Sequence, residues 1–297
     1  MDSLLGTFHG IEYLTTHFLI GFIFFHCLIL KAGGSAAESI QPNWKKNISV
    51  VVAISFFTTF VWMIMSVHDM TEVWDIKMLW MGMAHTTFAH VLCFKLLFLF
   101  SIFVTLTAVP FLKSFPYLLV FAATLLPLGN VLVSHAASSE HYSNYLIALD
   151  WLHSLCVGIW SGGLVALYVW LDKRIRINQV VNPEVSHSVV KRFSHFAMGS
   201  TFLLGLAGFI LAKLNGISIF KPWETEYGRL VLLKIFIFCL ALLAASINQF
   251  LHLRTWNPEN ELKFAKAIKR EVAIEFLLIT IVFIVAGYLT RTPLPGS

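Results

Sequence analysis

The chain has 297 residues, of which 58% are hydrophobic and 12% are charged. A typical soluble domain has roughly 25% charged residues, so a water-soluble globular fold is excluded. The formal net charge is +5, but the basic residues are spread over short segments between apolar runs. That pattern is typical of the loops of a membrane protein and not of a nucleic-acid-binding surface. We therefore predict an all-α protein whose partner is the lipid bilayer, with no nucleic-acid partner.

Apolar runs long enough to cross a bilayer, which takes about 20 residues, follow one another along the whole chain. They span residues 9–30, 48–67, 86–109, 115–134, 148–170, 195–213, 229–251 and 272–290. Backbone polar groups cannot stay unpaired in lipid, so each run is expected to be a helix. We expect the first run to be retained and not cleaved as a signal peptide. The sequence thus predicts a polytopic membrane protein with about eight transmembrane helices.

The lysine and arginine residues predict the orientation of these helices. The loops after the first, third, fifth and seventh runs hold 14 of the 21 basic residues. The positive-inside rule places these loops in the cytoplasm and both termini outside. The charged segment 258–272 is expected to be a helical extension on the cytoplasmic side.

A short internal similarity suggests a duplication. The stretch TTFA at 86–89 precedes Lys95, and TEYG at 225–228 precedes Lys234 at the same spacing, 139 residues later. Four predicted helices intervene, which suggests two four-helix halves in parallel orientation.

Histidine and methionine gather on the predicted outer side. Eight of the twelve histidines lie there: His9, His17, His68, His85, His90, His135, His141 and His153. Six of the eight methionines fall between the second run and the start of the third: Met63, Met65, Met70, Met78, Met81 and Met83. Imidazole and thioether form a ligand set suited to copper, and the thioether favours Cu(I). Any one of these residues could equally be a packing residue. The prediction of a copper ion therefore depends on so many of them lying on the same side.

Helical spacing refines this pattern. Met78, Met81 and His85 share one face if their segment is helical. Asp150 and His153 lie one turn apart in the fifth run, where the carboxylate is placed to orient the imidazole. Ionisable residues inside a membrane are functional candidates by default, and this adds His17, His90 and His153.

Other residue types are predicted to be structural. The cysteines all lie in apolar runs without a C-x-x-C pair, and they are expected to be buried small hydrophobes: Cys27, Cys93, Cys156 and Cys239. Gly162-Gly163 and the pair Gly205 and Gly208 are expected to let helices approach closely. With no Walker motif and no G-x-G-x-x-G, we expect no nucleotide partner and no enzymatic activity.

Several of these residues together resemble the signature of the copper-resistance protein D family. The motifs are SHAA at 134–137, DxxH at 150–153, WxGGL at 160–164, RFS at 192–194, Gly205 and Gly208, Tyr227-Gly228 with Lys234, Asn248, and LTxTP at 289–293. The resemblance is good from about 130 to 295 and looser before that. It divides the chain into an N-terminal half, 1–134, and a C-terminal half, 135–297, similar to the family's copper-resistance D domain.

The resemblance implies an eight-helix protein of the bacterial inner membrane, involved in copper transport and resistance, and with the positive-inside rule both termini are then periplasmic. His135 and His153 match the family's histidine positions, so copper contact is implied for these two. The end of the fourth helix and the start of the fifth must be neighbours, and we predict the centre of the site there. A third ligand is expected from His17, His68, His85, His90 or Met81.

Two alternatives remain open. A b-type haem held by two imidazoles would draw on His17, His90, His135 and His153. A membrane anchor or assembly partner for a periplasmic copper-binding protein is the other. The leading prediction is that copper is captured on the periplasmic side and passed across the membrane or to such a partner.

Overall fold

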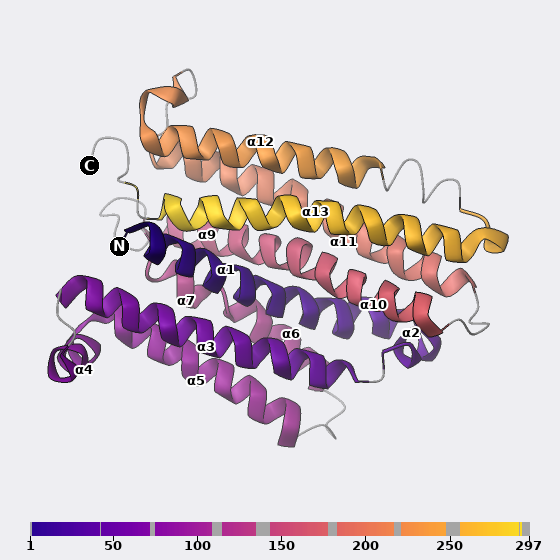
Figure 1. The fold of residues 1–297 in the computed structure, drawn as a ribbon, viewed down its shortest axis with the longest axis horizontal. Helices are drawn as coiled ribbons and strands as arrows, with labels where there is room; N and C mark the ends of the chain where they lie inside the picture. Colours follow the sequence, from indigo (N-terminus) through magenta and orange to yellow (C-terminus); the bar gives the residue numbers. More distant parts are fainter. Residues whose placement is uncertain are drawn as a thin grey trace.

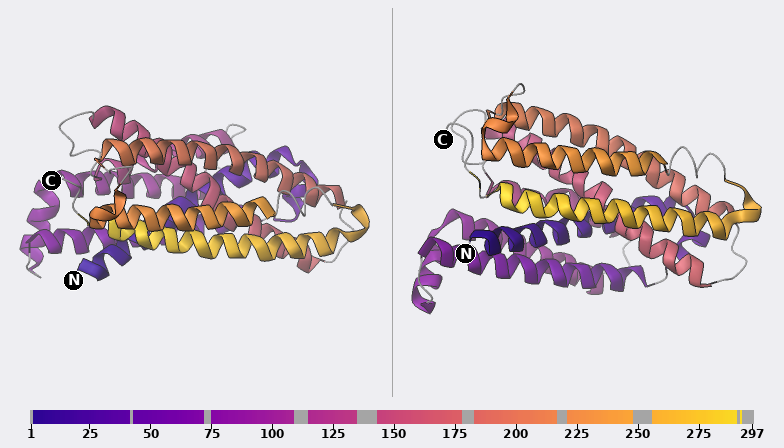
Figure 2. Two further views of the ribbon diagram at one scale, coloured as in Figure 1. Left: turned by 90° about the horizontal axis from the view of Figure 1, so that it is seen from above. Right: turned by 45° about the horizontal axis from the view of Figure 1, so that its top comes forward.

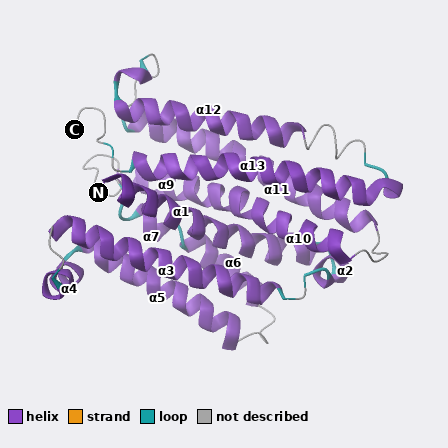
Figure 3. Ribbon diagram, viewed as in Figure 1, coloured by secondary structure: helices purple, strands orange, loops and turns teal. Residues whose placement is uncertain are grey.

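The computed structural model describes residues 2–41, 43–71, 75–108, 115–134, 143–177, 183–216, 221–247, 256–290 and 292. Within these residues all regular structure is helical and there is no strand (Figure 3). Seven of the described helices are long and apolar enough to cross a membrane, and the shorter apolar segment Pro116–Val131 joins them. The predicted all-α, polytopic fold is confirmed.

The first half of the chain forms these elements: α1 (Asp2–Phe24), η1 (Phe25–Leu30), α2 (Ser35–Ser39), α3 (Trp44–Thr71), α4 (Ile76–His85), α5 (Thr87–Ala108), α6 (Phe115–Leu125) and α7 (Leu128–Val131). The helix η1 continues α1 without a break. The fourth predicted span is interrupted between α6 and α7, where Pro127 has no backbone N–H to continue the helical hydrogen bonding. The α4 segment is helical, so the spacing of Met78, Met81 and His85 does place them on one face.

The second half forms α9 (Ser143–Val157), η2 (Gly158–Gly162), α10 (Gly163–Ile177), α11 (Pro183–Leu214), η3 (Pro222–Glu224), α12 (Glu226–Ile247), η5 (Pro258–Asn260) and α13 (Glu261–Leu289). The elements α9, η2 and α10 form one continuous rod. The charged segment 258–272 begins as η5 and continues directly into the membrane helix α13, as predicted.

The long helices run roughly along one axis, with α1 in the middle of the bundle (Figures 1 and 2). It packs against α3 on one side and against α13 and the α9–α10 rod on the other. The start of α1 and the end of α13 lie at the same end of the bundle, where His9 Nδ1 and Thr290 Oγ1 are 2.9 Å apart. The described ends of the chain therefore share one side, as an even number of spans requires.

The two halves share the packing of one pair of helices and differ in the packing of another pair. The pairs α1/α3 and α9/α11 both pack closely along their length. In the first half α3 also packs along α5, whereas α11 and α12 make almost no contact with each other, and α12 packs on α13 instead. Full superposition of the halves stays a prediction.

Large apolar side chains cover the outside of the bundle as well as its interior. Phe94 is 73% exposed and Phe202 is 71% exposed, which suits a surface that faces lipid. The expectation that all four cysteines are buried is wrong for two of them, because Cys93 and Cys239 are exposed. In a bilayer an apolar run has apolar residues on its outer face too, so apolar neighbours do not imply burial.

Candidate functional site

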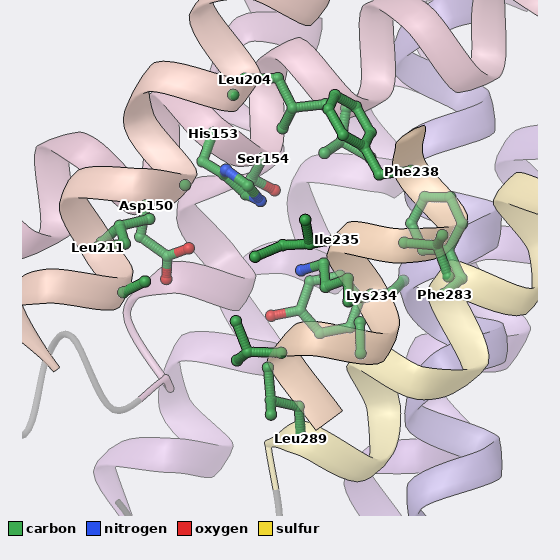
Figure 4. A pocket seen from close by; sticks show the side chains of 18 of the residues that line it. Asp150, His153, Ser154, Leu204, Leu211, Lys234, Ile235, Phe238, Phe283 and Leu289 are labelled. Carbon is green, nitrogen blue, oxygen red and sulfur yellow. The ribbon is translucent and has the colours of Figure 1, made fainter. Parts of the chain in front are cut away.

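A cavity of about 480 Å³ lies in the second half, between α9, α11, α12 and α13, with α1 on one side (Figure 4). It lies between α11 and α12, the two helices that do not pack on each other. Most of its wall is apolar, and its polar side chains are Tyr13, His17, Ser134, Asp150, His153, Ser154, Asn215, Tyr227, Lys234 and Thr290. An apolar cavity with a few convergent polar groups is the usual form of a binding site.

His153, on α9, presents its imidazole to this cavity between Asp150 and Ser154 (Figure 4). The ring packs against Gly208 of α11, where an added Cβ would lie 3.0 Å from its Cε1 atom. The ring interacts with the backbone of Leu204 on α11, but its buried Nδ1 atom makes no hydrogen bond of good geometry to a described residue. Because buried polar atoms are normally satisfied, this nitrogen is a candidate for binding a ligand.

His17 links α1 to α9 at the wall of the same cavity. Its Nδ1 lies 2.5 Å from the carbonyl oxygen of Tyr13, and its Nε2 lies 2.8 Å from Ser154 Oγ. A carbonyl only accepts, so Nδ1 carries the proton and Nε2 accepts from the serine hydroxyl. Binding of a metal at Nε2 would have to displace Ser154.

The cavity also contains one carboxylate and one ammonium group. Asp150 accepts a hydrogen bond of 2.9 Å from Ser134, and Lys234 extends its Nζ into the space near Asp150 (Figure 4). The two attract each other electrostatically, but Lys234 makes no hydrogen bond or ion pair with another residue in the described part of the chain. A cation entering here meets attraction from Asp150 and repulsion from Lys234.

The first half also contains a carboxylate and an ammonium group, but there the two groups bond directly to each other. Glu12 on α1 and Lys95 on α5 form an ion pair, and both are buried. Thr16, Thr59 and Asn130 bond to the carboxylate at 2.9 to 3.1 Å. Our sequence reasoning missed Glu12, although a carboxylate within an apolar run is itself a signal of an intramembrane polar site.

The structure separates the predicted ligands into two groups. Of the predicted ligands within the described residues, only His17 and His153 line the cavity. The others lie in the first half: buried His68 at the end of α3, and the exposed residues His85, Met81 and His90 on α4 and α5. His135 lies outside the described residues, so its pairing with His153 stays a prediction.

The residues that the structure describes contain no group of three or more His, Cys, Asp or Glu side chains that would hold a metal ion. His17 is unsuited to the haem alternative because both of its ring nitrogens are engaged, and the pair of His135 and His153 stays a prediction. His90 is exposed on α5, with Nε2 2.9 Å from the Ala84 carbonyl oxygen, and does not line the cavity.

The fold and the cavity define a polytopic helical membrane protein with a polar site inside the bilayer region. Residues 1–145 match the family described as copper resistance protein D-like, N-terminal domain, and residues 187–289 match copper resistance protein D. The chain therefore belongs to the copper-resistance protein D-like proteins. Asp150 and His153 lie between the two matched segments, whereas α1 and α11 to α13 lie within them.

One relative is the copper transport protein CutJ of Bacillus subtilis (strain 168), which is 28% identical over 172 residues. The match covers 57% of this chain and 29% of that protein, so the chain spans less than a third of its relative. No solved structure matches the chain.

Proposed function

We propose that this chain binds copper in the cavity of its second half and moves it across the bacterial inner membrane or passes it to a partner. The observation that carries the proposal is His153, a partly buried imidazole whose Nδ1 makes no hydrogen bond of good geometry to a described residue, one helical turn from a carboxylate and on the wall of a cavity. Neutral imidazole is a good copper ligand. The family and the copper-transporting relative support copper as the cargo. We propose a binding and transport role and no enzymatic step.

The position of the cavity along the bundle supports capture from outside. Its lining residues on α13 run from Ile279 to Thr290, the end of that helix, and those on α12 begin at Tyr227. These are the halves of the helices nearest the chain ends, opposite the basic loops. The positive-inside rule makes this end periplasmic.

Two aromatic side chains line the cavity on the side away from the chain ends. Trp160 and Phe238 meet edge to face, with ring centroids 5.6 Å apart and planes at 89°. Both line the cavity near the middle of the bundle. Copper that reaches His153 is therefore held above an apolar barrier, and passage to the cytoplasm requires this pair to separate.

Copper uptake by vesicles that contain only this protein tests the proposal. Replacing His153 with Ala should lower copper affinity or uptake rate by roughly 10-fold or more, since even groups that merely orient a ligand cost 10–100-fold. His195→Ala is the matched control, because His195 is exposed on α11 and its Nδ1 bonds only to the Lys191 carbonyl oxygen, at 2.7 Å.

The outcomes separate the alternatives. Uptake that is equal in the His153 variant and in the control removes the cavity from the path. Vesicles of the wild-type protein that bind copper but accumulate none would favour the anchor or assembly role. A strong Soret band in the purified protein would restore the haem alternative.

A further inference from the structure

Two sulfur atoms meet in the first half of the protein, away from the cavity. Cys93 Sγ on α5 lies 3.9 Å from Met63 Sδ on α3. Met63 is 2% exposed and belongs to a small apolar cluster with Trp62 and Leu92. Cys93 is exposed on the outer face of α5, within the span that is apolar enough to lie in lipid. The pair is thus half enclosed by protein.

The sulfur–sulfur distance matches that of a three-coordinate Cu(I) site. Metal–sulfur bonds of about 2.3 Å place the sulfurs of a trigonal site about 4.0 Å apart, and those of a linear site about 4.6 Å apart. The observed 3.9 Å needs almost no movement for the trigonal case. Two further thioethers belong to the same region, because the side chains of Met65 and Met83 pack against the same apolar cluster.

The methionines around this pair form a gradient of exposure. Met78 and Met81 on α4 are 39% and 45% exposed. Met65 and Met83 are partly buried, and Met63 is buried. The helix α4 packs on both α3 and α5, so its thioethers lie next to the two helices that carry the sulfur pair. Thioethers therefore lie at exposed, partly buried and buried positions between the protein surface and Met63.

We propose that Met63 and Cys93, completed by Met65 or Met83, form a Cu(I) site that the methionines of α4 supply. The proposal rests on the proposed function for its cargo and specifies the form of that cargo as a soft monovalent ion. On binding, the Cys93 thiol releases its proton to water, and the thiolate and Cu(I) together are neutral. Neutrality matters here, because an uncompensated charge is costly next to hydrocarbon. Thiolate and thioether ligands select Cu(I).

Anaerobic titration of the purified full-length protein with Cu(I), against a chromophoric Cu(I) chelator, tests the site. X-ray absorption at the copper edge then identifies the ligands. The wild-type protein should show sulfur neighbours at about 2.3 Å. The double variant Met63→Leu/Cys93→Ser should lose one equivalent of Cu(I), or bind it at least 10-fold more weakly. Met198→Leu and Cys27→Ala, which remove a thioether and a thiol elsewhere, should bind as the wild type does.

The variant Met63→Leu alone keeps the test decisive if the double variant does not fold, because Leu conserves the volume of Met. It should lower Cu(I) affinity and the number of sulfur neighbours. Unchanged stoichiometry and affinity in either variant, or a copper spectrum with nitrogen and oxygen neighbours only, would overturn the site. That result leaves the proposed function standing if His153→Ala still abolishes vesicle uptake. Sulfur-bound Cu(I) without any uptake by the wild type would overturn transport across the membrane and leave the site standing.

Discussion

Glu12 and Lys95 show what a fully satisfied charge pair inside this protein looks like. The carboxylate accepts from Lys95, Thr16, Thr59 and Asn130, and the ammonium group also donates to Asn130 Oδ1 at 2.5 Å. Removing one partner leaves the other charge buried without compensation, which costs about 3–5 kcal/mol. Removing both leaves no such charge.

We therefore expect Lys95→Met to lower the free energy of unfolding in detergent by about 3–5 kcal/mol. The double variant Glu12→Gln/Lys95→Met should be clearly more stable than Lys95→Met alone. Lys77→Met is the control, because Lys77 is exposed on α4 and should change stability by no more than about 0.5 kcal/mol. A single variant as stable as this control would contradict the structural role of the pair.

At the level of residues, the sequence predicted which side chains belong to the site better than it predicted which side chains contact one another. His153 and Asp150 were found from their spacing on one helix, and the structure places both at the cavity. The helical pattern could not show that His17 would use both ring nitrogens or that Lys234 would share the cavity with Asp150. Those facts depend on how α1, α9 and α12 pack, and a period of 3.6 residues carries no information about which helices become neighbours.

The α1 helix and the α9–α10 rod approach each other very closely where they cross. A Cβ added at Gly21 or Gly162 would overlap the backbone of the opposite element, so the two helices touch through their main chains. The crossing lies one turn from His17, whose bond to Ser154 spans the same pair of elements. The predicted role of Gly162 in close helix approach is confirmed. For Gly205 the prediction is wrong, because open space surrounds it and the cavity occupies that side of α11.

Gly162→Ala should force these elements apart. We expect a loss of about 1–3 kcal/mol of stability, the usual cost of overpacking, and weaker copper binding because α9, which carries His153, is displaced. Gly199→Ala is a matched control on α11, where an added Cβ meets no atom within 4 Å. It should be neutral or slightly stabilising, because Ala favours a helix over Gly. Thermal unfolding of both variants in the same detergent measures the difference, and equal losses would show that the crossing is not special.

For the whole molecule, the number of spans and their order followed from apolar length alone. The break between α6 and α7 did not, since a run with one Pro127 still reads as a continuous apolar span. The cavity was also beyond sequence analysis. It exists because α11 and α12 do not pack on each other as α3 and α5 do. The sequence did not predict this difference, because the similarity of TTFA and TEYG suggested equal packing in the two halves.

The orientation of the bundle in the membrane determines which side the cavity faces. The distribution of basic residues predicts that orientation. One end carries the basic residues of the α10 terminus and of the starts of α11 and α13: Lys173, Arg174, Arg176, Lys191, Arg192, Lys263, Lys266, Lys269 and Arg270. Two of them, Arg174 and Lys269, are fixed by ion pairs of 2.9 Å to Glu261 and 2.6 Å to Asp172. The cavity lies toward the opposite end, where few basic residues lie.

We expect alkaline phosphatase, which is active only outside the cytoplasm, to be active when fused after Ser297 and inactive when fused after Ile177 at the end of α10. A fluorescent protein that folds only in the cytoplasm should give the reverse result. The two reporters check each other, because a fusion that is merely unstable is silent with both. Phosphatase activity of the fusion after Ile177 would show that the cavity faces the cytoplasm. Its aromatic barrier at Trp160 and Phe238 would then close the periplasmic side, and the same residues would serve release of copper from the cell instead of its capture.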